Sequence, residues 1–177
     1  MSDHLIKLLQ DISVRRGRFT LASGTESDLY VDIRTAALHS EASYVIASRI
    51  LDILKPEVRA VAGVVLGGAP LVSSTTTLAR VRNRHLHGLL IRKEPKAHGT
   101  GNQVEGMDNL RSFDVALLED TVTTGGSLLS GIAAAEEMGL RVIQVIAVLD
   151  REVGGSQNLW DHGYELESLT RLRDLVP

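Results

Sequence analysis

The spacing of apolar residues changes within the first part of the chain. Over residues 5–12 the apolar positions recur at helical spacing, which predicts a first helix that Gly17 ends. The apolar segments 19–21 and 29–33 are shorter and are separated by turn-forming residues, so they predict two strands. The chain therefore begins with a helix followed by a short pair of strands.

From residue 40 onwards, predicted helices and strands alternate. The pattern predicts helices at 40–54, from a glycine-rich turn to about residue 82, at 126–138, near 157–162 and in a last turn, and strands at 60–65, 87–91, 115–118, 141–149 and 164–166. Such alternation indicates right-handed crossovers between parallel strands. We therefore predict an α/β fold, with a parallel twisted sheet flanked by helices on both faces. Because no repeat or composition break interrupts the chain, residues 1–177 are expected to form one domain.

Composition narrows this prediction. Apolar residues make up 44% of the chain but aromatic residues only 3%, so Val, Leu, Ile and Ala must fill the core, which suits a buried parallel sheet. The net charge of -3 favours neither nucleic acid nor a membrane as a partner. The chain has no cysteine, no signal-peptide pattern and no apolar run of roughly 20 residues, so a cytoplasmic location is expected.

Candidate chemistry starts where the predicted strand 115–118 ends. Two carboxylates, Glu119 and Asp120, are followed by a segment rich in Thr and Gly and then by a helix. The glycines and hydroxyls suit an anion at a helix N-terminus, whereas the carboxylates suit sugar hydroxyls or a hydrated magnesium ion. A capped strand-to-helix turn without a ligand is the alternative, and the Walker lysine is absent.

Residues 116–127, Ala-Leu-Leu-Glu-Asp-Thr-Val-Thr-Thr-Gly-Gly-Ser, resemble the signature of type I phosphoribosyltransferases. The resemblance implies the fold of that family, in which this loop holds the 5-phosphate of phosphoribosyl diphosphate. It implies that Glu119 and Asp120 contact the ribose and hold Mg²⁺ through water, with no direct protein ligand to the metal. The implied sugar-phosphate contacts are Glu119, Asp120, Thr121, Val122, Thr123, Thr124, Gly125, Gly126 and Ser127, with Gly67 and Gly68 approaching the diphosphate.

The polar stretch 92–109 admits two interpretations. Charged and glycine-rich, it is either a solvated loop or a mobile lid that closes over a diphosphate leaving group and excludes water. Its start, Arg92-Lys-Glu-Pro-Lys-Ala-His-Gly99, is similar to the catalytic loop of orotate phosphoribosyltransferases. That resemblance implies a flexible loop shared across a homodimer, with pyrophosphate contacts from Arg92, Lys93, Lys96 and His98.

Further segments agree with that family. Residues 19–24 and 30–34 resemble its hood over the base, so we define the hood as residues 1–35 approximately plus the C-terminal tail. Arg151, after the strand 141–149, matches the arginine that binds the orotate carboxylate, and Thr123 is a second implied orotate contact. The sequence departs at Ala22 and Gly67, where some members carry lysines.

The resemblance implies Mg²⁺-dependent transfer of the phosphoribosyl group to orotate, with Lys96, His98, Glu119 and Asp120 as the catalytic residues. The product would be orotidine 5-phosphate, in de novo UMP synthesis. Two alternatives stay open: a phosphoribosyltransferase for another base, and a non-catalytic regulator of the same fold that senses phosphoribosyl diphosphate.

Overall fold

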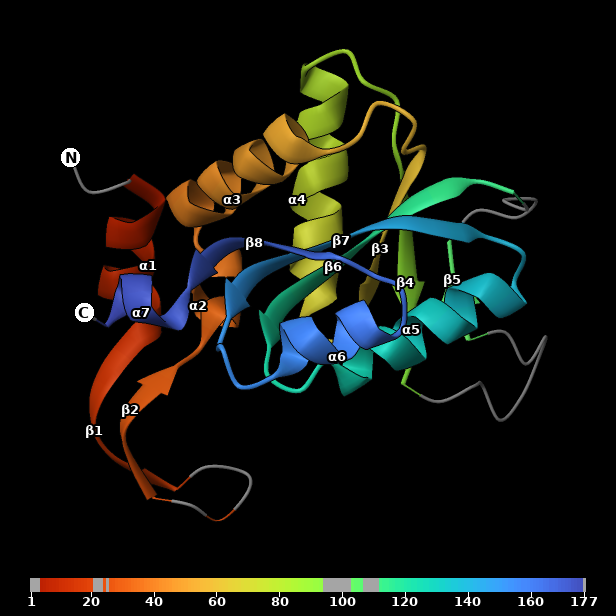
Figure 1. Ribbon diagram of the computed structural model, residues 1–177. Helices are drawn as coiled ribbons and strands as arrows, with labels where there is room; N and C mark the ends of the chain where they lie inside the picture. Colours follow the sequence, from red (N-terminus) through yellow and green to blue (C-terminus); the bar gives the residue numbers. More distant parts are fainter. Residues whose placement is uncertain (1–3, 21–23, 25, 94–102, 107–111, 177) are drawn as a thin grey trace.

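A six-stranded sheet runs through the centre of the protein (Figure 1). The structure is a computed structural model and describes the chain except residues 1–3, 21–23, 25, 94–102, 107–111 and 177. The strand order is β5-β4-β3-β6-β7-β8, and all neighbours are parallel except β4 and β5. The strands are β3 (Ala60–Val64), β4 (His87–Ile91), β5 (Val104–Glu105), β6 (Asp114–Val122), β7 (Arg141–Asp150) and β8 (Leu166–Arg171). The predicted parallel sheet is confirmed.

Helices cover both faces of this sheet, as Figure 1 shows. One face carries α1 (His4–Ser13), α2 (Ile33–Ala37), α3 (Ser40–Ile53) and α4 (Gly68–Val81), while α5 (Gly126–Glu137) and α6 (Gly155–Asp161) cover the other. Successive residues of β6 alternate between the two cores: Ala116 and Leu118 face the first, and Val115 and Leu117 face the second. Both faces are therefore apolar, which explains the continuous Val, Leu and Ala runs in the strands.

The N-terminal strands form a separate antiparallel hairpin, β1 (Val14–Thr20) and β2 (Glu26–Val31). It extends away from the central sheet, beside α1 and α2 (Figure 1). The last helix, α7 (Leu172–Leu175), lies against α1, where the Gln10 side-chain amide donates to the Leu175 carbonyl at 3.1 Å. The two ends of the chain are thus joined at the base of the hairpin.

Several predicted boundaries were wrong. The first helix ends at Ser13 rather than at Gly17, because β1 begins directly and Val14 pairs with Val31. The strand expected at 164–166 is β8, which starts only at Leu166. The helix α2 and the strand β5 were not predicted at all. Strand β1 starts five residues before the predicted strand 19–21, and β6 ends four residues after the predicted strand 115–118. The other helices and strands match their predictions to within three residues.

Within the described part of the chain, no helix combines the length and the apolar character needed to cross a membrane.

Candidate active site

The strand β6 carries the acidic pair to the carboxyl edge of the sheet. The sequence placed Glu119 and Asp120 in a loop after residue 118, but β6 continues to Val122, which pairs with Asp150 of β7. Both carboxylates therefore project from a strand that is held on each side by neighbours, β3 over its first half and β7 along its length. In parallel α/β sheets this edge is where ligands bind.

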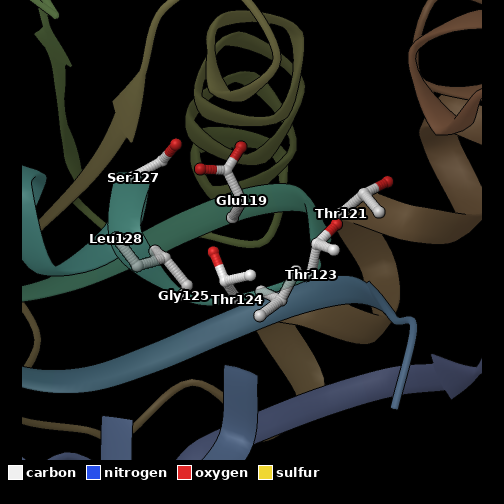
Figure 2. Close-up of a pocket in the computed structure, with 9 residues that line it drawn as sticks. Glu119, Thr121, Thr123, Thr124, Gly125, Ser127 and Leu128 are labelled. Atoms are coloured by element: carbon white, nitrogen blue, oxygen red, sulfur yellow. The ribbon is translucent and has the colours of Figure 1, made fainter. Parts of the chain in front are cut away.

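A turn directly after β6 encloses an open cavity with an empty volume of about 300 Å³. Its lining contains the predicted 5-phosphate loop, residues 123–127, together with Glu119, Thr121, Val122 and Leu128, whereas Asp120 is not among the residues that line it. Gly125 has φ +80, a conformation that glycine adopts without strain, and α5 starts at the next residue. The first backbone amides of α5 lack helical acceptors and so are available to an anion. Figure 2 shows the Ser127 hydroxyl and the Glu119 carboxyl pointing to the same side of this turn.

The helix α6 supports this phosphate loop from behind. The Asn158 side-chain amide donates to the Thr124 carbonyl at 2.7 Å. The backbone of Gly155 lies so close that a Cβ there would be 2.6 Å from the Thr123 carbonyl oxygen. The hydrogen bond from Asn158 holds the Thr124 carbonyl, and the absence of a side chain at Gly155 lets α6 pack closely against the loop.

We expect Asn158→Ala to weaken binding of a phosphate group at this loop without altering the fold. Losing one hydrogen bond of about 1 kcal/mol should raise the KM for a substrate that carries this phosphate roughly fivefold. Steady-state kinetics with this substrate varied provide the measurement. Gln157→Ala is the matched control, because Gln157 lies on the same helix and its side-chain hydrogen bond, among the described residues, is to the exposed Asp161. Equal KM values for the two variants would contradict the supporting role of Asn158.

The acidic pair is electrostatically asymmetric. Glu119 is only 7% exposed, and among the described residues its Oε2 has no hydrogen-bond partner. Burial, reinforced by the adjacent Asp120 carboxyl, raises the pKa of Glu119 to about 8, although the Asp120 amide and the Lys93 ammonium oppose this. Asp120 is more accessible, and its Oδ1 accepts from the Thr121 amide at 2.8 Å. A ligand that donates hydroxyls or carries a cation would satisfy the Glu119 oxygen.

This raised pKa predicts a pH-dependent stability of the ligand-free protein. Between the ordinary carboxyl pKa of 4.5 and about 8, folded Glu119 keeps a proton that the unfolded chain has released. The free energy of unfolding therefore falls as pH rises through that window. Glu119→Gln stays neutral, so its stability advantage over wild type should grow to a few kcal/mol between about pH 4 and pH 9. Denaturant titrations across this range test it, and a pH-independent difference between the two proteins would contradict it.

A second, larger cavity adjoins the first and shares Glu119, Thr121 and Ser127 with it. Its empty volume is about 580 Å³, and the loop between β3 and α4 forms one wall. Within that wall the Val65–Leu66 peptide bond is cis, and Gly67 lies directly against Asp120. A Cβ at Gly67 would be 2.6 Å from the Asp120 carboxyl, and one at Gly68 would be 2.6 Å from the Gly63 Cα. Gly67 thus brings the loop backbone to the cavity, while Gly68 packs against the backbone of β3.

Arg92 and Lys93, the first two cations of the polar stretch 92–109, have different surroundings. Lys93 lines the larger cavity, together with Asp120 and Gly67. Arg92 instead donates from Nε to Glu105 of β5 at 2.9 Å, and its backbone amide bonds to the Gln103 carbonyl. The described contacts of Arg92 therefore lie at the stem of the loop rather than in the cavity. Lys96 and His98 lie outside the described residues.

The predicted base-binding residues lie beside the phosphate loop. The Arg151 amide donates to the Val122 carbonyl at 2.9 Å, so the residue after β7 is fastened to the end of β6, next to Thr123. The buried Nε of Arg151 has no hydrogen-bond partner within the described part of the chain. A buried guanidinium nitrogen without an acceptor is costly, and a carboxylate ligand would supply that acceptor.

Sequence reasoning missed one charged residue of this site. Arg34, which follows the hood strand β2, lines the larger cavity and lies 3.9 Å from the Asp120 carboxyl. Only its proximity in sequence to the hood motif pointed toward the site, because the tertiary fold is what brings α2 next to β6. Asn158 was missed for the same reason, since it lies in a separate helix far along the chain.

The donor set suits a metal held mainly by a ligand. No group of three or more His, Cys, Asp or Glu residues that could bind a metal occurs in the described ranges. Glu119, with an oxygen lacking any described partner, and Asp120 offer carboxylate oxygens to the same cavity. Hard cations prefer oxygen ligands and often keep several waters. The residues therefore fit a hydrated divalent ion that a polyphosphate substrate brings with it.

Two carboxylates near the end of a strand, a Thr/Gly turn leading into a helix, and a loop with Gly67 against Asp120 occur together at the carboxyl edge of a parallel sheet. This combination, on this sheet with its hairpin at one end, defines the fold and site of a type I phosphoribosyltransferase.

Comparison with known proteins then identifies the particular family. The orotate phosphoribosyltransferase of Rhodopirellula baltica is 38% identical over 177 residues, covering 96% of this chain and 91% of that protein. The crystal structure of Mycobacterium tuberculosis H37Rv orotate phosphoribosyltransferase in complex with Fe(III) dicitrate superposes with a TM-score of 0.87 at 33% identity, covering 98% and 97% of the two chains. Its complex with 5-phospho-alpha-D-ribosyl 1-diphosphate gives 0.81 at 30% identity, covering 97% and 96%. No family model matches the chain. The chain belongs to the orotate phosphoribosyltransferase family.

Proposed function

We propose that this protein transfers the 5-phosphoribosyl group from phosphoribosyl diphosphate to orotate, giving orotidine 5-phosphate and pyrophosphate in de novo UMP synthesis. The observation that carries the proposal is the pair of adjoining cavities at the end of β6. One is lined by the loop 123–127, and the other by Lys93, Gly67 and the acidic pair. The similarity to the relatives reported above also supports the proposal, because they are named orotate phosphoribosyltransferases and match nearly the whole chain.

The reaction breaks the bond between the sugar's anomeric carbon and the diphosphate oxygen and forms a bond from that carbon to the base nitrogen. Positive charge develops on the sugar while negative charge collects on the leaving pyrophosphate. The phosphate loop, residues 123–127, would hold the 5-phosphate through its amides and hydroxyls. Glu119 and Asp120 would hold the ribose hydroxyls, and the Asp120 carboxylate would offset the positive charge that develops on the sugar.

Leaving-group stabilisation falls to the cationic side of the larger cavity. We propose that Lys93 and, by resemblance, Lys96 and His98 donate to the departing pyrophosphate, with the loop 92–109 closing over it and excluding water. The ion pair with Glu105 gives Arg92 a role at the base of this loop besides the predicted pyrophosphate contact. Gly67 and Gly68 let the backbone of the opposite wall approach the diphosphate.

Orotate would lie between the hood and the phosphate loop. We propose that the Arg151 guanidinium binds the orotate carboxylate and that Thr123 contacts the ring, since both lie at the joined ends of β6 and β7. The ring nitrogen is readily deprotonated, so positioning rather than a strong base should supply most of the rate.

Mg²⁺ is the proposed metal, carried by the diphosphate and contacted through water by Glu119 and Asp120. When bound, it would neutralise charge on the substrate and on the leaving group. Removing divalent ions with EDTA should abolish turnover, and adding Mg²⁺ should restore it; activity that persists in EDTA would contradict this assignment.

We also propose a cytoplasmic homodimer in which the flexible loop of one subunit reaches the neighbouring site. The exposed apolar side chains Leu38 and Tyr44, at the junction of α2 and α3, support an interface there. Within each subunit, residues 1–177 would act as one domain, and the Gln10–Leu175 contact supports a hood that includes the C-terminal tail. Sedimentation equilibrium should give a dimer, and a monomer at working concentrations would contradict the shared loop.

An ultraviolet assay with a panel of bases tests the proposed function. With phosphoribosyl diphosphate and Mg²⁺, orotate should be consumed while adenine, guanine and uracil are not. Turnover of a purine instead of orotate would establish the alternative base specificity. Tight binding of phosphoribosyl diphosphate without any product would establish a regulator.

A further inference from the structure

Arg34 is a cation at the active site to which the proposed mechanism gives no role. It occupies the second position of α2, directly after the hood hairpin. Its Nε donates to Oδ1 of Asp32 at 3.0 Å and its Nη2 to Oδ2 at 3.3 Å, so the guanidinium is held as a two-pronged fork. Asp32 is itself fixed, because its Oδ1 also accepts the Arg34 amide as the N-cap of α2. The orientation of the guanidinium is therefore set before any ligand binds.

The held guanidinium faces the larger cavity. Arg34 lines this cavity with Gly67, Lys93 and Asp120, and its side chain is 46% exposed. Its distance of 3.9 Å from the Asp120 carboxyl is too long for a hydrogen bond. The bonds to Asp32 engage Nε and Nη2, and within the described part of the chain no hydrogen bond engages Nη1. The Nη1 nitrogen of this cavity-lining residue thus remains available to a ligand.

A diphosphate is highly negative, and the Asp120 carboxylate already lies in this cavity. A second cation beside Lys93 would therefore favour binding of the diphosphate. Glu119 and Asp120 occupy one side, and Lys93 is the other described cation among the lining residues. The Gly67 wall cannot supply one, since any side chain there would collide with the Asp120 carboxyl. Arg34 reaches the same space from the hood side and carries a planar donor group that matches phosphate oxygens.

We propose that Arg34 is a further substrate-binding residue, which donates to the diphosphate of phosphoribosyl diphosphate and is held in position for this by Asp32. The inference rests on the proposed function, because it assigns a contact within that site. It also links the hood, which includes Arg34, to the sugar-phosphate half of the site.

Arg34→Gln tests the proposal by direct titration of phosphoribosyl diphosphate in the presence of Mg²⁺, followed by steady-state kinetics. Loss of a charge-assisted contact should raise the Kd and KM for this substrate about tenfold to hundredfold, with the KM for orotate unchanged. Arg34→Lys keeps the charge but loses the fork, so it should fall between wild type and Arg34→Gln. Asp32→Asn should weaken binding several-fold by releasing the guanidinium.

Arg82→Gln is the matched control, because Arg82 forms a similar pair with Asp52 on α3 at 2.7 Å, remote from the site. An unchanged Kd in Arg34→Gln, or a rise confined to the KM for orotate, would overturn the proposal. The titration needs no turnover, so it also decides the role of Arg34 if wild-type protein fails to convert orotate. That failure, in turn, would contradict the proposed function while leaving the titration result intact.

Discussion

Gly67→Ala is expected to lose most of its turnover while remaining folded. The new Cβ would lie 2.6 Å from the Asp120 carboxyl, so this side chain must move away. Displacing a catalytic group by about 1 Å costs on the order of a hundredfold in rate. The backbone of Gly67, with φ -61 and ψ -40 at the start of α4, suits alanine well, so stability should not fall. Steady-state kinetics and thermal unfolding of the same preparation provide the two measurements.

Gly163→Ala serves as the control for this variant. Gly163 has φ +87 and open space around it, so alanine is strained there but meets no catalytic group. The two variants should therefore show opposite profiles: Gly67→Ala stable and slow, Gly163→Ala less stable and fully active. Normal turnover in Gly67→Ala would mean that the Asp120 position seen here is not the catalytic one.

Asp120→Asn is the second change with a large expected effect. Asparagine keeps the size of the side chain, and its carbonyl oxygen can still accept from the Thr121 amide, but the negative charge facing the sugar is lost. Removing one preorganised electrostatic contact to a transition state costs about a hundredfold to a thousandfold in kcat. The loss should appear mainly in kcat rather than in KM, because the charge on the sugar develops only as the diphosphate leaves.

Asp52→Asn removes an exposed carboxylate that pairs with Arg82 and should leave kcat unchanged. A drop in kcat shared by both variants would indicate a general effect of protein charge. A rise in KM at constant kcat for Asp120→Asn would place Asp120 in ground-state binding alone and would contradict its role in the transition state.

The alternation of strands and helices could be predicted because burial on both faces leaves a strong pattern. Strand β4 was predicted at its observed bounds, and α3 differs by a single residue, since apolar runs and Pro56 mark their ends. The end of β6 could not be predicted, because Glu119 and Asp120 are polar and only their pairing with β7 keeps them in the strand. Strand β5 is two residues long and exists through its pairing with β4.

The core of the site was also predictable, for a related reason. A phosphate loop is local in sequence, so Glu119 and the turn 121–127 line one cavity, and Asp120 lines the adjoining one. Contacts that depend on the tertiary fold left no such signal: Arg34 and Asn158 reach the site from α2 and α6. Arg92 shows the converse, because a sequence motif gives the charge of a residue but not the direction of its side chain.

Phosphorus NMR of wild-type protein with phosphoribosyl diphosphate and Mg²⁺, recorded with and without orotate, tests the proposed transfer directly. The diphosphate signals of the substrate should be replaced, only when orotate is present, by equal amounts of pyrophosphate and one nucleotide 5-phosphate. Pyrophosphate released at the same rate without orotate, accompanied by ribose 5-phosphate, would contradict it.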